Sequence, residues 1–225
     1  MKIIFLNTWK GTQEKQIRDF LTKENETTDI FCFQEVDEKM QGICGEILMD
    51  YLIIIETKPL TDGQFFYNAI YIKKSIEILE STIVLREIEE AGLGLHIKIK
   101  INNKIFNIIN CHGVPYPGDK LDTETRIVQS REILNFTKNI NEPMIIGGDF
   151  NLDPDTKSIK MFEEKNFLNL IKKFEIKTTR NENSWAKYPD KQLFADYVFV
   201  KKVEVNNFKV PDSDISDHLA MILEV

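Results

Sequence analysis

The sequence predicts an α/β sandwich in which two packed β-sheets are flanked by helices. Roughly ten segments have the short apolar pattern of strands, and several of them follow one another as hairpins. Roughly three or four segments have a helical pattern, whereas a purely parallel doubly wound sheet would need more helices. The chain has 225 residues, of which 42% are hydrophobic and 29% charged, and no linker or repeat divides it. We therefore expect a single domain over residues 1–225.

The first part of the chain begins as strand, helix, strand. Residues 2–6 and 30–33 are short apolar runs that are typical of buried strands. Between them, residues 13–23 place Ile17, Phe20 and Leu21 on one face of a helix. A weaker helical pattern covers residues 40–49, and further strands are predicted over residues 51–55, 68–72 and 76–85.

Residues 93–101 carry the clearest strand pattern. Leucine and isoleucine alternate with Gly94, His96, Lys98 and Lys100, so one face of the strand is apolar and the other is polar. Because His96 lies on the polar face, we expect it to be a solvated surface residue without a function.

Turns and caps divide the second half of the chain. Asn102 and Asn103 tolerate a positive φ, so they predict a two-residue hairpin that leads into a central strand over residues 104–111. Asp122 is expected to cap a long helix that ends near Asn139. Further strands are predicted over residues 144–147, 194–200, 204–210 and 219–225.

Polar side chains follow or interrupt these strands. A single Asn or Asp after a strand is usually a turn residue or a helix cap. Glu35 is harder to explain in this way, because Phe31-Cys32-Phe33 carries the chain into the core directly before it, and a carboxylate there needs a cation or donors. Convergence on one site would explain the whole set, which comprises Asn7, Gln34, Glu35, Asn110, His112, Asp149, Asn151, Asp196, Asp217 and His218.

The composition of this set favours one kind of chemistry. Oxygen ligands with few histidines suit Mg²⁺ or Mn²⁺ better than zinc. Phosphoester hydrolysis needs such a cation, a base that activates water, and donors for the developing oxyanion. No HExxH motif and no G-x-S-x-G elbow is present, so a zinc hydrolase and a serine hydrolase are disfavoured.

Six short motifs in order resemble those of the endonuclease/exonuclease/phosphatase superfamily, which has the deoxyribonuclease-I-like fold. The resemblance spans residues 2–225 and implies a four-layer α/β sandwich with two packed mixed sheets. The motifs are Asn7-Thr8-Trp9, residues 29–36 (DIFCFQEV), Asn110-Cys111-His112, Gly148-Asp149-Phe150-Asn151, Asp196-Tyr197-Val198-Phe199 and Ser216-Asp217-His218.

The resemblance also implies roles for the strand-end residues. Glu35 would be the principal Mg²⁺ ligand, with Asn7 and Asp217 nearby, and Mn²⁺ could substitute for Mg²⁺. Asp149 and Asn151 would position the attacking water and the phosphate. His218 would act as the base with Asp196 orienting an imidazole, and His112 would stabilise the transition state, although members of the superfamily differ in which group is the base.

Departures from the family pattern reduce the range of candidate substrates. His112 stands where abasic-site endonucleases typically carry tyrosine, and the extended motifs of inositol polyphosphate phosphatases are absent. Lys10, Arg180 and Trp185 are candidate substrate contacts, although residues 177–185 could equally be a solvated loop with one half-buried tryptophan. Arg126 and Gln129 are expected to be structural and to lie beneath the site.

The formal charge of −7 argues against a tight grip on long nucleic acid. We therefore predict a metal-dependent phosphodiesterase or nuclease that acts on small or single-stranded substrates, with nucleic acid as one candidate. The alternatives are a phosphomonoesterase for a sugar or lipid phosphate and, ranked lower, an idle binding module. The three cysteines lack a CxxC spacing, and we find no export signal or membrane span, so a cytoplasmic monomer is expected.

Overall fold

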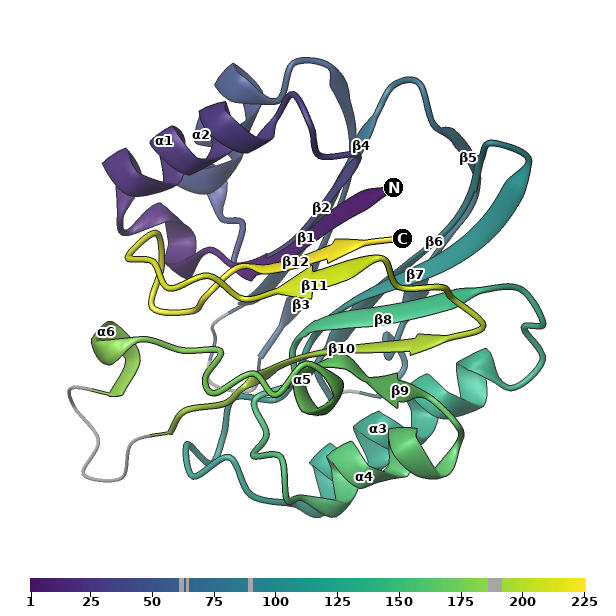
Figure 1. Cartoon of the computed structure of the whole chain (residues 1–225). Coiled ribbons are helices and arrows are strands. Elements are labelled where there is room, and N and C mark those ends of the chain that lie inside the picture. Colours follow the sequence, from purple (N-terminus) through teal and green to yellow (C-terminus); the bar gives the residue numbers. More distant parts are fainter. Residues whose placement is uncertain (61–62, 64, 89–90, 186–191) are drawn as a thin grey trace.

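The computed structural model describes residues 1–60, 63, 65–88, 91–185 and 192–225. These residues form two six-stranded mixed sheets that pack face to face, with helices on both outer sides (Figure 1). The four-layer α/β sandwich that the resemblance implied is thereby confirmed. Among the described residues, no helix has the length and apolar character needed to cross a membrane.

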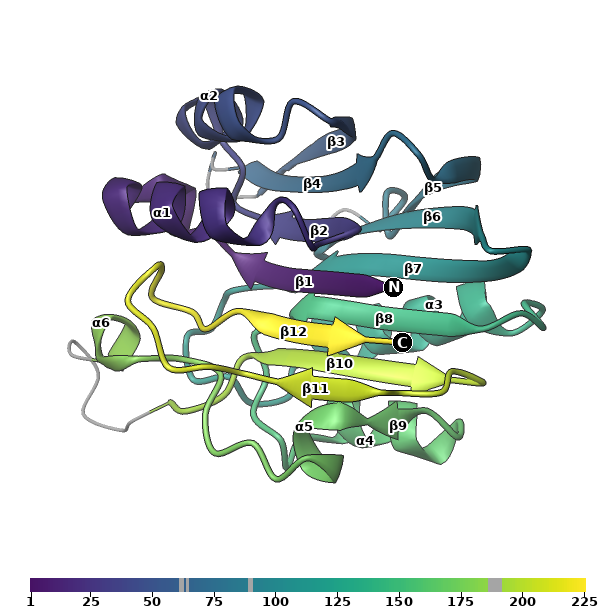
Figure 2. The ribbon, with the colours of Figure 1, turned by 45° about the horizontal axis from the view of Figure 1, so that its top comes forward.

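The first sheet contains the two strands nearest the chain ends. β1 pairs in parallel with β2 and antiparallel with β12, and the remaining pairs are antiparallel (Figure 2). The helices α1 (Glu14–Glu24) and α2 (Glu38–Ile47) cover its outer face, and the short helix η1 (Trp9–Gly11) follows β1. The strand order is β11 (Asn207–Lys209), β12 (Met221–Glu224), β1 (Lys2–Asn7), β2 (Ile30–Gln34), β4 (Phe65–Lys73) and β3 (Tyr51–Pro59).

The second sheet is also mixed, because β7 and β8 pair in parallel and the other pairs are antiparallel. Its outer face is covered by α3 (Glu124–Thr137) and α4 (Lys157–Glu164), while α5 (Leu170–Lys173) and α6 (Glu182–Trp185) are single turns. The strand order is β5 (Glu77–Val84), β6 (Leu93–Ile101), β7 (Lys104–His112), β8 (Met144–Asp149), β10 (Asp196–Lys201) and β9 (Leu168–Asn169).

Alternation along β1 explains why both faces of the first sheet are apolar. Ile3 and Phe5 belong to the core between the two sheets, whereas Ile4 and Leu6 belong to the core under α1 and α2. Because successive side chains of a strand point to opposite faces, Asn7 shares the inner face with Phe5. The strand therefore delivers Asn7 to the space between the sheets.

Two glycines of β8 allow the sheets to approach closely. A Cβ on Gly147 would lie 2.7 Å from the ring of Phe5, which crosses over from the first sheet. Gly148 has a φ of +131°, and a Cβ there would lie 2.1 Å from the carbonyl oxygen of Cys111. The Gly-Gly pair thus places Asp149, the next residue, next to the first sheet.

Most elements lie where the sequence predicts them, but five of the described elements were not expected. These are η1, α4, β9, α5 and α6, each of which has eight residues or fewer. The hairpin at Asn102 and Asn103 is confirmed, since both residues have positive φ. The assignment of Asp122 was wrong. Thr123 caps α3, and the carboxylate of Asp122 instead accepts hydrogen bonds from the first turn of α4.

The prediction that His96 is a surface residue is also wrong. It lies on the outer face of β6, but α3 covers that face, and its side chain is 2% exposed. The ring packs edge-on against Phe136 and makes a 3.0 Å hydrogen bond to Asn107. The polar face of the strand is therefore a helix-covered face, on which Nε2 of His96 bonds Oδ1 of Asn107, while Nδ1 of His96 and Nδ2 of Asn107 are buried without a hydrogen-bond partner among the described residues.

Candidate active site

The strand ends bring most of the predicted polar residues together at one edge of the sandwich. In the second sheet, Asp149 at the end of β8 is level with His112 on β7 and with Asp196 on β10. In the first sheet, Asn7 on β1 is level with Gln34, directly before Glu35. Because residues at matching positions of neighbouring strands lie side by side, this register builds the site.

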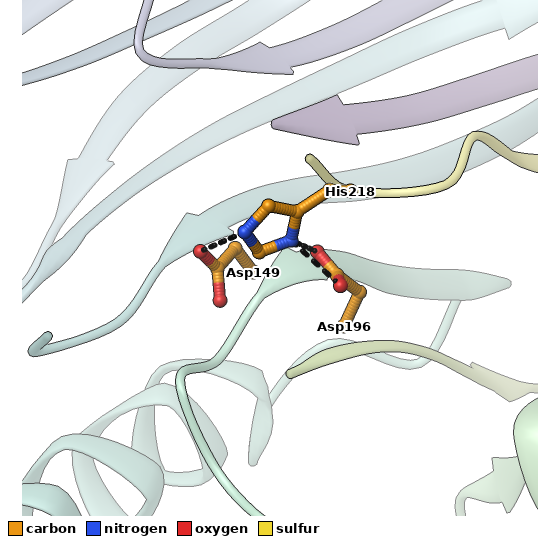
Figure 3. Close-up of side chains that lie close together, drawn as sticks. All are labelled: Asp149, Asp196 and His218. Carbon is orange, nitrogen blue, oxygen red and sulfur yellow. Dashed lines mark hydrogen bonds and ion pairs between the residues drawn. The ribbon is translucent and has the colours of Figure 1, made fainter. Parts of the chain in front are cut away.

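A buried chain of Asp196, His218 and Asp149 forms its centre (Figure 3). Nδ1 of His218 lies 3.0 and 2.9 Å from the two carboxylate oxygens of Asp196. Nε2 of the same ring lies 3.8 Å from Oδ2 of Asp149. The bonds to Asp196 fix the orientation of the ring, so Nε2 of His218 faces Asp149.

His218 reaches this position from the segment before β12. Its backbone is bridged to Arg180, and the neighbouring Leu219 donates its N–H to the carbonyl of Thr179. The hydroxyl of Ser216 donates to the carbonyl oxygen of Asn7 at 2.7 Å. The last motif is thereby fastened to the first.

Asn7 connects the carboxylates of the two sheets. Its Nδ2 donates to Oε1 of Glu35 at 3.1 Å and to Oδ2 of Asp149 at 3.0 Å. Glu35 has a φ of +59°, which turns the chain out of β2 directly after the buried strand. Two carboxylate oxygens therefore face one point between the sheets.

These donors fit a hard divalent cation. Glu35 is half-buried, and carboxylate oxygens are what Mg²⁺ and Mn²⁺ prefer. Asp149, Asp196 and His218 also offer ligand atoms within 4.8 Å of one another. Both oxygens of Asp196 are bonded to the imidazole, however, so Glu35 and Asp149 are the better candidates to hold a cation.

Asp217 is not joined to Glu35 or Asn7 by any polar contact that the described residues show. Its Oδ1 lies 3.3 Å from the hydroxyl of Ser216. The charge of Asp217 instead helps to raise the pKa of the neighbouring His218.

The surrounding charges shift the pKa values of the central pair. Burial alone would lower the pKa of His218, but the charges of Asp196, Asp217 and Asp149 outweigh it and raise this pKa to about 9. Burial alone would raise the pKa of Asp149. The charges of His218, His112 and Lys120 reverse this effect and lower the pKa of Asp149 to about 2. Asp149 is therefore ionised at neutral pH.

His112 and Asn151 flank Asp149. Nε2 of His112 lies 3.8 Å from Oδ2 of Asp149, and its ring packs edge-on against Phe66. Burial lowers the pKa of His112, so its neutral form is favoured. The backbone N–H of Asn151 donates to Oδ1 of Asp149 at 2.8 Å, and its Nδ2 donates to the carbonyl oxygen of Gly113.

Lys120 also lies at the site, although no sequence pattern predicted it. This residue is 6% exposed, and its Nζ donates to Oδ1 of Asn151 at 2.6 Å. It lies in the loop between β7 and α3 and has a φ of +60°. No strand ends near it, so the pattern that identified the other residues could not identify Lys120.

Arg126 and Gln129 hold that loop, which confirms their structural role. Arg126 is fully buried, and Oε1 of Gln129 accepts hydrogen bonds from the N–H groups of Gly92 and Val114. The guanidinium of Arg126 donates to the carbonyl oxygens of Val114, Pro115, Pro117 and Leu121 and to the carboxylate of Asp119.

Of the three predicted substrate contacts, Arg180 and Trp185 line a common groove, whereas Lys10 is not among the residues that line it. Lys10 is exposed on η1, directly after the turn that follows Asn7. Arg180 is 6% exposed beside His218, whereas Trp185 is half-buried on α6. Asp212 also lines the groove that Arg180 and Trp185 share.

Asn110, within β7, and Gln34, the last residue of β2, serve the fold. Nε2 of Gln34 donates to Oδ1 of Asn110 at 2.5 Å, and Nδ2 of Asn110 donates to the carbonyl oxygens of Phe33 and Ala69. This buried amide pair ties the inner faces of the two sheets together just below the site.

A four-layer sandwich with carboxylates and histidines at this edge is the architecture of a class of phosphoester hydrolases. The chain belongs to the endonuclease/exonuclease/phosphatase family, whose model matches residues 5–218. A comparison with curated proteins gave no match.

Several solved structures share the fold. A mannosyl-6-phosphatase of Bacteroides thetaiotaomicron is 16% identical with a TM-score of 0.78, and the match covers 100% of this chain and 98% of that one. The human Nocturnin catalytic domain is 18% identical with a TM-score of 0.73, covering 99% and 92%. D. rerio TDP2, complexed with a single-strand DNA product, is 15% identical with a TM-score of 0.77, covering 99% and 97%. At such identities the likeness shows the fold alone.

Proposed function

We propose that this protein is a divalent-metal-dependent phosphodiesterase that acts on small or single-stranded substrates through attack of water. The observation that carries the proposal is the buried chain of Asp196, His218 and Asp149 beside the paired oxygens of Glu35 and Asp149. Such a site combines an oriented imidazole, an ionised carboxylate and a place for a cation, which together are what phosphoester hydrolysis requires.

In this proposal His218 and Asp149 handle the attacking water. The charges around His218 raise its pKa to about 9, and the charge of a bound cation would lower this pKa again, so that Nε2 is free to accept a proton. Asp196 then holds the proton of Nδ1 while Nε2 takes the proton of the water, and the P–O bond to the leaving group breaks. Asp149 accepts a hydrogen bond from that water and orients it. When bound, the cation supplies positive charge that polarises the phosphoryl oxygens and offsets the carboxylate charges around the imidazole.

The remaining site residues bind the cation and the phosphoryl group. Glu35 is the principal ligand in this proposal, with Asn7 and Asp217 nearby. His112 and Asn151, on either side of Asp149, donate to the oxygens of the pentacoordinate phosphorus.

The preference for a diester rests on two aromatic side chains, one exposed and one half-buried. Tyr116 is 57% exposed on the loop that also carries Lys120, and Trp185 is half-buried on the opposite loop. A diester has a group on each side of phosphorus, and these rings could contact both groups. The net charge of −7 disfavours long duplexes.

A phosphomonoesterase is the second candidate. It is favoured by two buried cations, Lys120 and Arg180, because a monoester dianion needs more positive charge than a diester does. The fold does not decide between the two, since structures with this fold include a mannosyl-6-phosphatase and a TDP2 complex with a DNA product.

We also propose that the protein works as a cytoplasmic monomer. Cys32, Cys44 and Cys111 are all free and buried, which is compatible with a reducing compartment.

A panel of substrates tests the proposed activity. Protein freed of metal with EDTA is assayed with added Mg²⁺ or Mn²⁺ on bis-nitrophenyl phosphate, nitrophenyl phosphate, short single-stranded oligonucleotides and nicked plasmid. We expect metal-dependent turnover that is faster on the diesters. Metal-independent turnover, or none, would contradict the proposal. Faster turnover of the monoester, with no cleavage of any oligonucleotide, would support the second candidate.

A further inference from the structure

Two buried cations lie beside the central chain without a carboxylate bonded to either one among the described residues. Lys120 and Arg180 are each 6% exposed, and the hydrogen bonds of both cationic groups run to neutral oxygens. Burial of an unpaired charge is costly, so such groups are normally paired or hold a ligand.

The surroundings of Lys120 direct its ammonium toward the site. Nζ donates to Oδ1 of Asn151 at 2.6 Å, and the carbonyl oxygen of Lys120 accepts the N–H of Asp153 at 2.8 Å. Burial lowers the pKa of this lysine, while the charge of Asp149 opposes the shift. An ammonium has three donors, so at least one donor besides that used by Asn151 can serve a ligand.

Arg180 approaches the same place from the opposite loop. Its Nη1 lies 3.1 Å from Oε1 of Gln192 and 3.4 Å from the carbonyl oxygen of the same residue. Its Nε is buried and lacks a hydrogen-bond partner. Arg180 faces His218 in an antiparallel bridge, and directly opposed residues project to the same side, so the guanidinium and the imidazole share one face.

Gln192 joins the two loops. While its Oε1 accepts from Arg180, its Nε2 donates to the carbonyl oxygen of Gly118 at 2.7 Å. Gly118 lies two residues before Lys120 in the sequence. A single amide side chain therefore fixes the spacing between the loops that carry the two cations.

We propose that Lys120 and Arg180 form a two-cation site that binds the non-bridging oxygens of the phosphoryl group under attack. The proposal rests on the phosphoester hydrolase function proposed above and deepens it. The ammonium bonds Asn151, the backbone of Arg180 is bridged to that of His218, and the charges of Lys120 and Arg180 are close enough to repel each other, so both cations lie beside the central chain. A tetrahedral oxyanion placed there accepts hydrogen bonds from both cations, and charge that develops on its oxygens is stabilised.

A purely structural role for Lys120 makes a different prediction. If Lys120 only holds the amide of Asn151 in place, its ammonium never touches the anion, and loss of the lysine would matter only while Asn151 is present. A double-mutant cycle separates these possibilities, because residues that act through one another show non-additive effects.

The test measures binding of inorganic phosphate to the metal-free protein by calorimetry. We expect Lys120→Met and Arg180→Met each to raise the dissociation constant by about tenfold or more, the scale for losing a charge-assisted hydrogen bond. Lys120→Arg should stay within about threefold of the natural protein, because the charge is kept. Lys104→Met removes an exposed lysine from a remote hairpin and should change nothing. Thermal melting identifies any variant that is not folded, and Lys120→Arg and Arg180→Lys then serve as the comparison.

Three results would overturn the two-cation site. Failure of the natural protein to bind phosphate, or unchanged binding by both methionine variants, would overturn the proposal. So would loss of the Lys120→Met effect in an Asn151→Ala background, because the lysine would then act only through the amide. If phosphate binding follows the expected pattern but no phosphoester is hydrolysed, the two-cation site stands and the proposed function fails.

Discussion

An imidazole held between two buried carboxylates depends on each of them in a different way. Asp196 bonds Nδ1 of His218 with both oxygens, whereas Asp149 lies 3.8 Å from Nε2 and accepts hydrogen bonds from Asn7 and Asn151. The two aspartates are equally buried, so exposure does not distinguish them. Their contacts distinguish them, because only Asp196 bonds the imidazole with both of its oxygens.

Asp196→Asn should lower kcat by about 10²-fold or more, because an amide cannot hold Nδ1 as a carboxylate does. The affinity for the activating metal should change little, since Asp196 is not a proposed ligand. Steady-state assays at several Mn²⁺ concentrations measure both quantities. Asp149→Ala, His218→Ala and His112→Ala are expected to show losses of similar size. Normal turnover by a folded Asp196→Asn variant would refute the orienting role.

Glu35→Gln should mainly weaken metal binding. The half-buried carboxylate loses the charge that attracts a divalent cation, while the chain of Asp196, His218 and Asp149 remains intact. We expect the Mg²⁺ concentration that gives half-maximal rate to rise at least about tenfold, as happens when a charged ligand is lost. Glu164→Gln, on an exposed helix face, is the matched control. An unchanged metal requirement would remove Glu35 from the ligand set.

His96 provides a prediction for stability rather than activity. Burial lowers its pKa below the ordinary value, so between these two values the unfolded chain binds more protons than the folded one. The contribution of His96 to stability is therefore present above its ordinary pKa and lost as the pH falls. From pH 6.5 to 5, the natural protein should lose more unfolding free energy than His96→Gln, by up to about 1.4 kcal/mol per pH unit.

Urea titrations across this range measure the difference. The pKa of His112 is shifted in the same direction and that of His218 is raised, but both residues are present in both proteins, so their contributions cancel in the comparison. Parallel pH dependence of the two proteins would show that the buried His96 does not resist protonation.

At the scale of elements, Asp122 links α3 and α4, two helices that are separated by β8 in the sequence. It directly precedes the cap of α3, yet its carboxylate lies 2.6 and 3.0 Å from the N–H groups of Lys157 and Ser158 at the start of α4. Asp122→Ala should therefore reduce the unfolding free energy by about 1 to 2 kcal/mol, the range for loss of an N-cap. Asp122→Asn should cost less. Equal stability of the alanine variant and the natural protein in urea would contradict the capping role.

The elements also show how far sequence patterns extend. Apolar runs located the long strands, and the polar residue at each strand end located most of the site. The pattern along β6 could not reveal that α3 covers His96, because a polar face under a helix has the same period as a solvated one.

The sequence pattern did not predict Lys120 as a site residue for a related reason. Its place beside Asn151 is set by a loop that Arg126 holds through backbone carbonyls, and such contacts leave no periodic trace in the sequence. The short elements β9, α5 and α6 likewise have too few residues to show a period.

For the whole molecule, we expect a monomer that unfolds in a single transition. Strands of both sheets contribute to one core, in which Phe5 of the first sheet contacts the same apolar cluster as Ile146 of the second. Neither sheet can lose its inner face without exposing that of the other. Light scattering and calorimetry check these expectations, and two separate thermal transitions would show that the sheets are independent.

The hydrogen bond between the last motif and the first determines at which stage of folding the chain can become active. Ser216 bonds the carbonyl of Asn7 across 209 residues of sequence, and Asn7 bonds Asp149 across 142. Contacts between such distant residues form only after long loops have closed. A chain in which the sheets have not yet docked therefore has its carboxylates and imidazoles scattered and cannot hydrolyse a phosphoester. Activity should therefore appear in a single step, when the two sheets dock. The rate at which turnover appears during refolding would measure the rate of this docking.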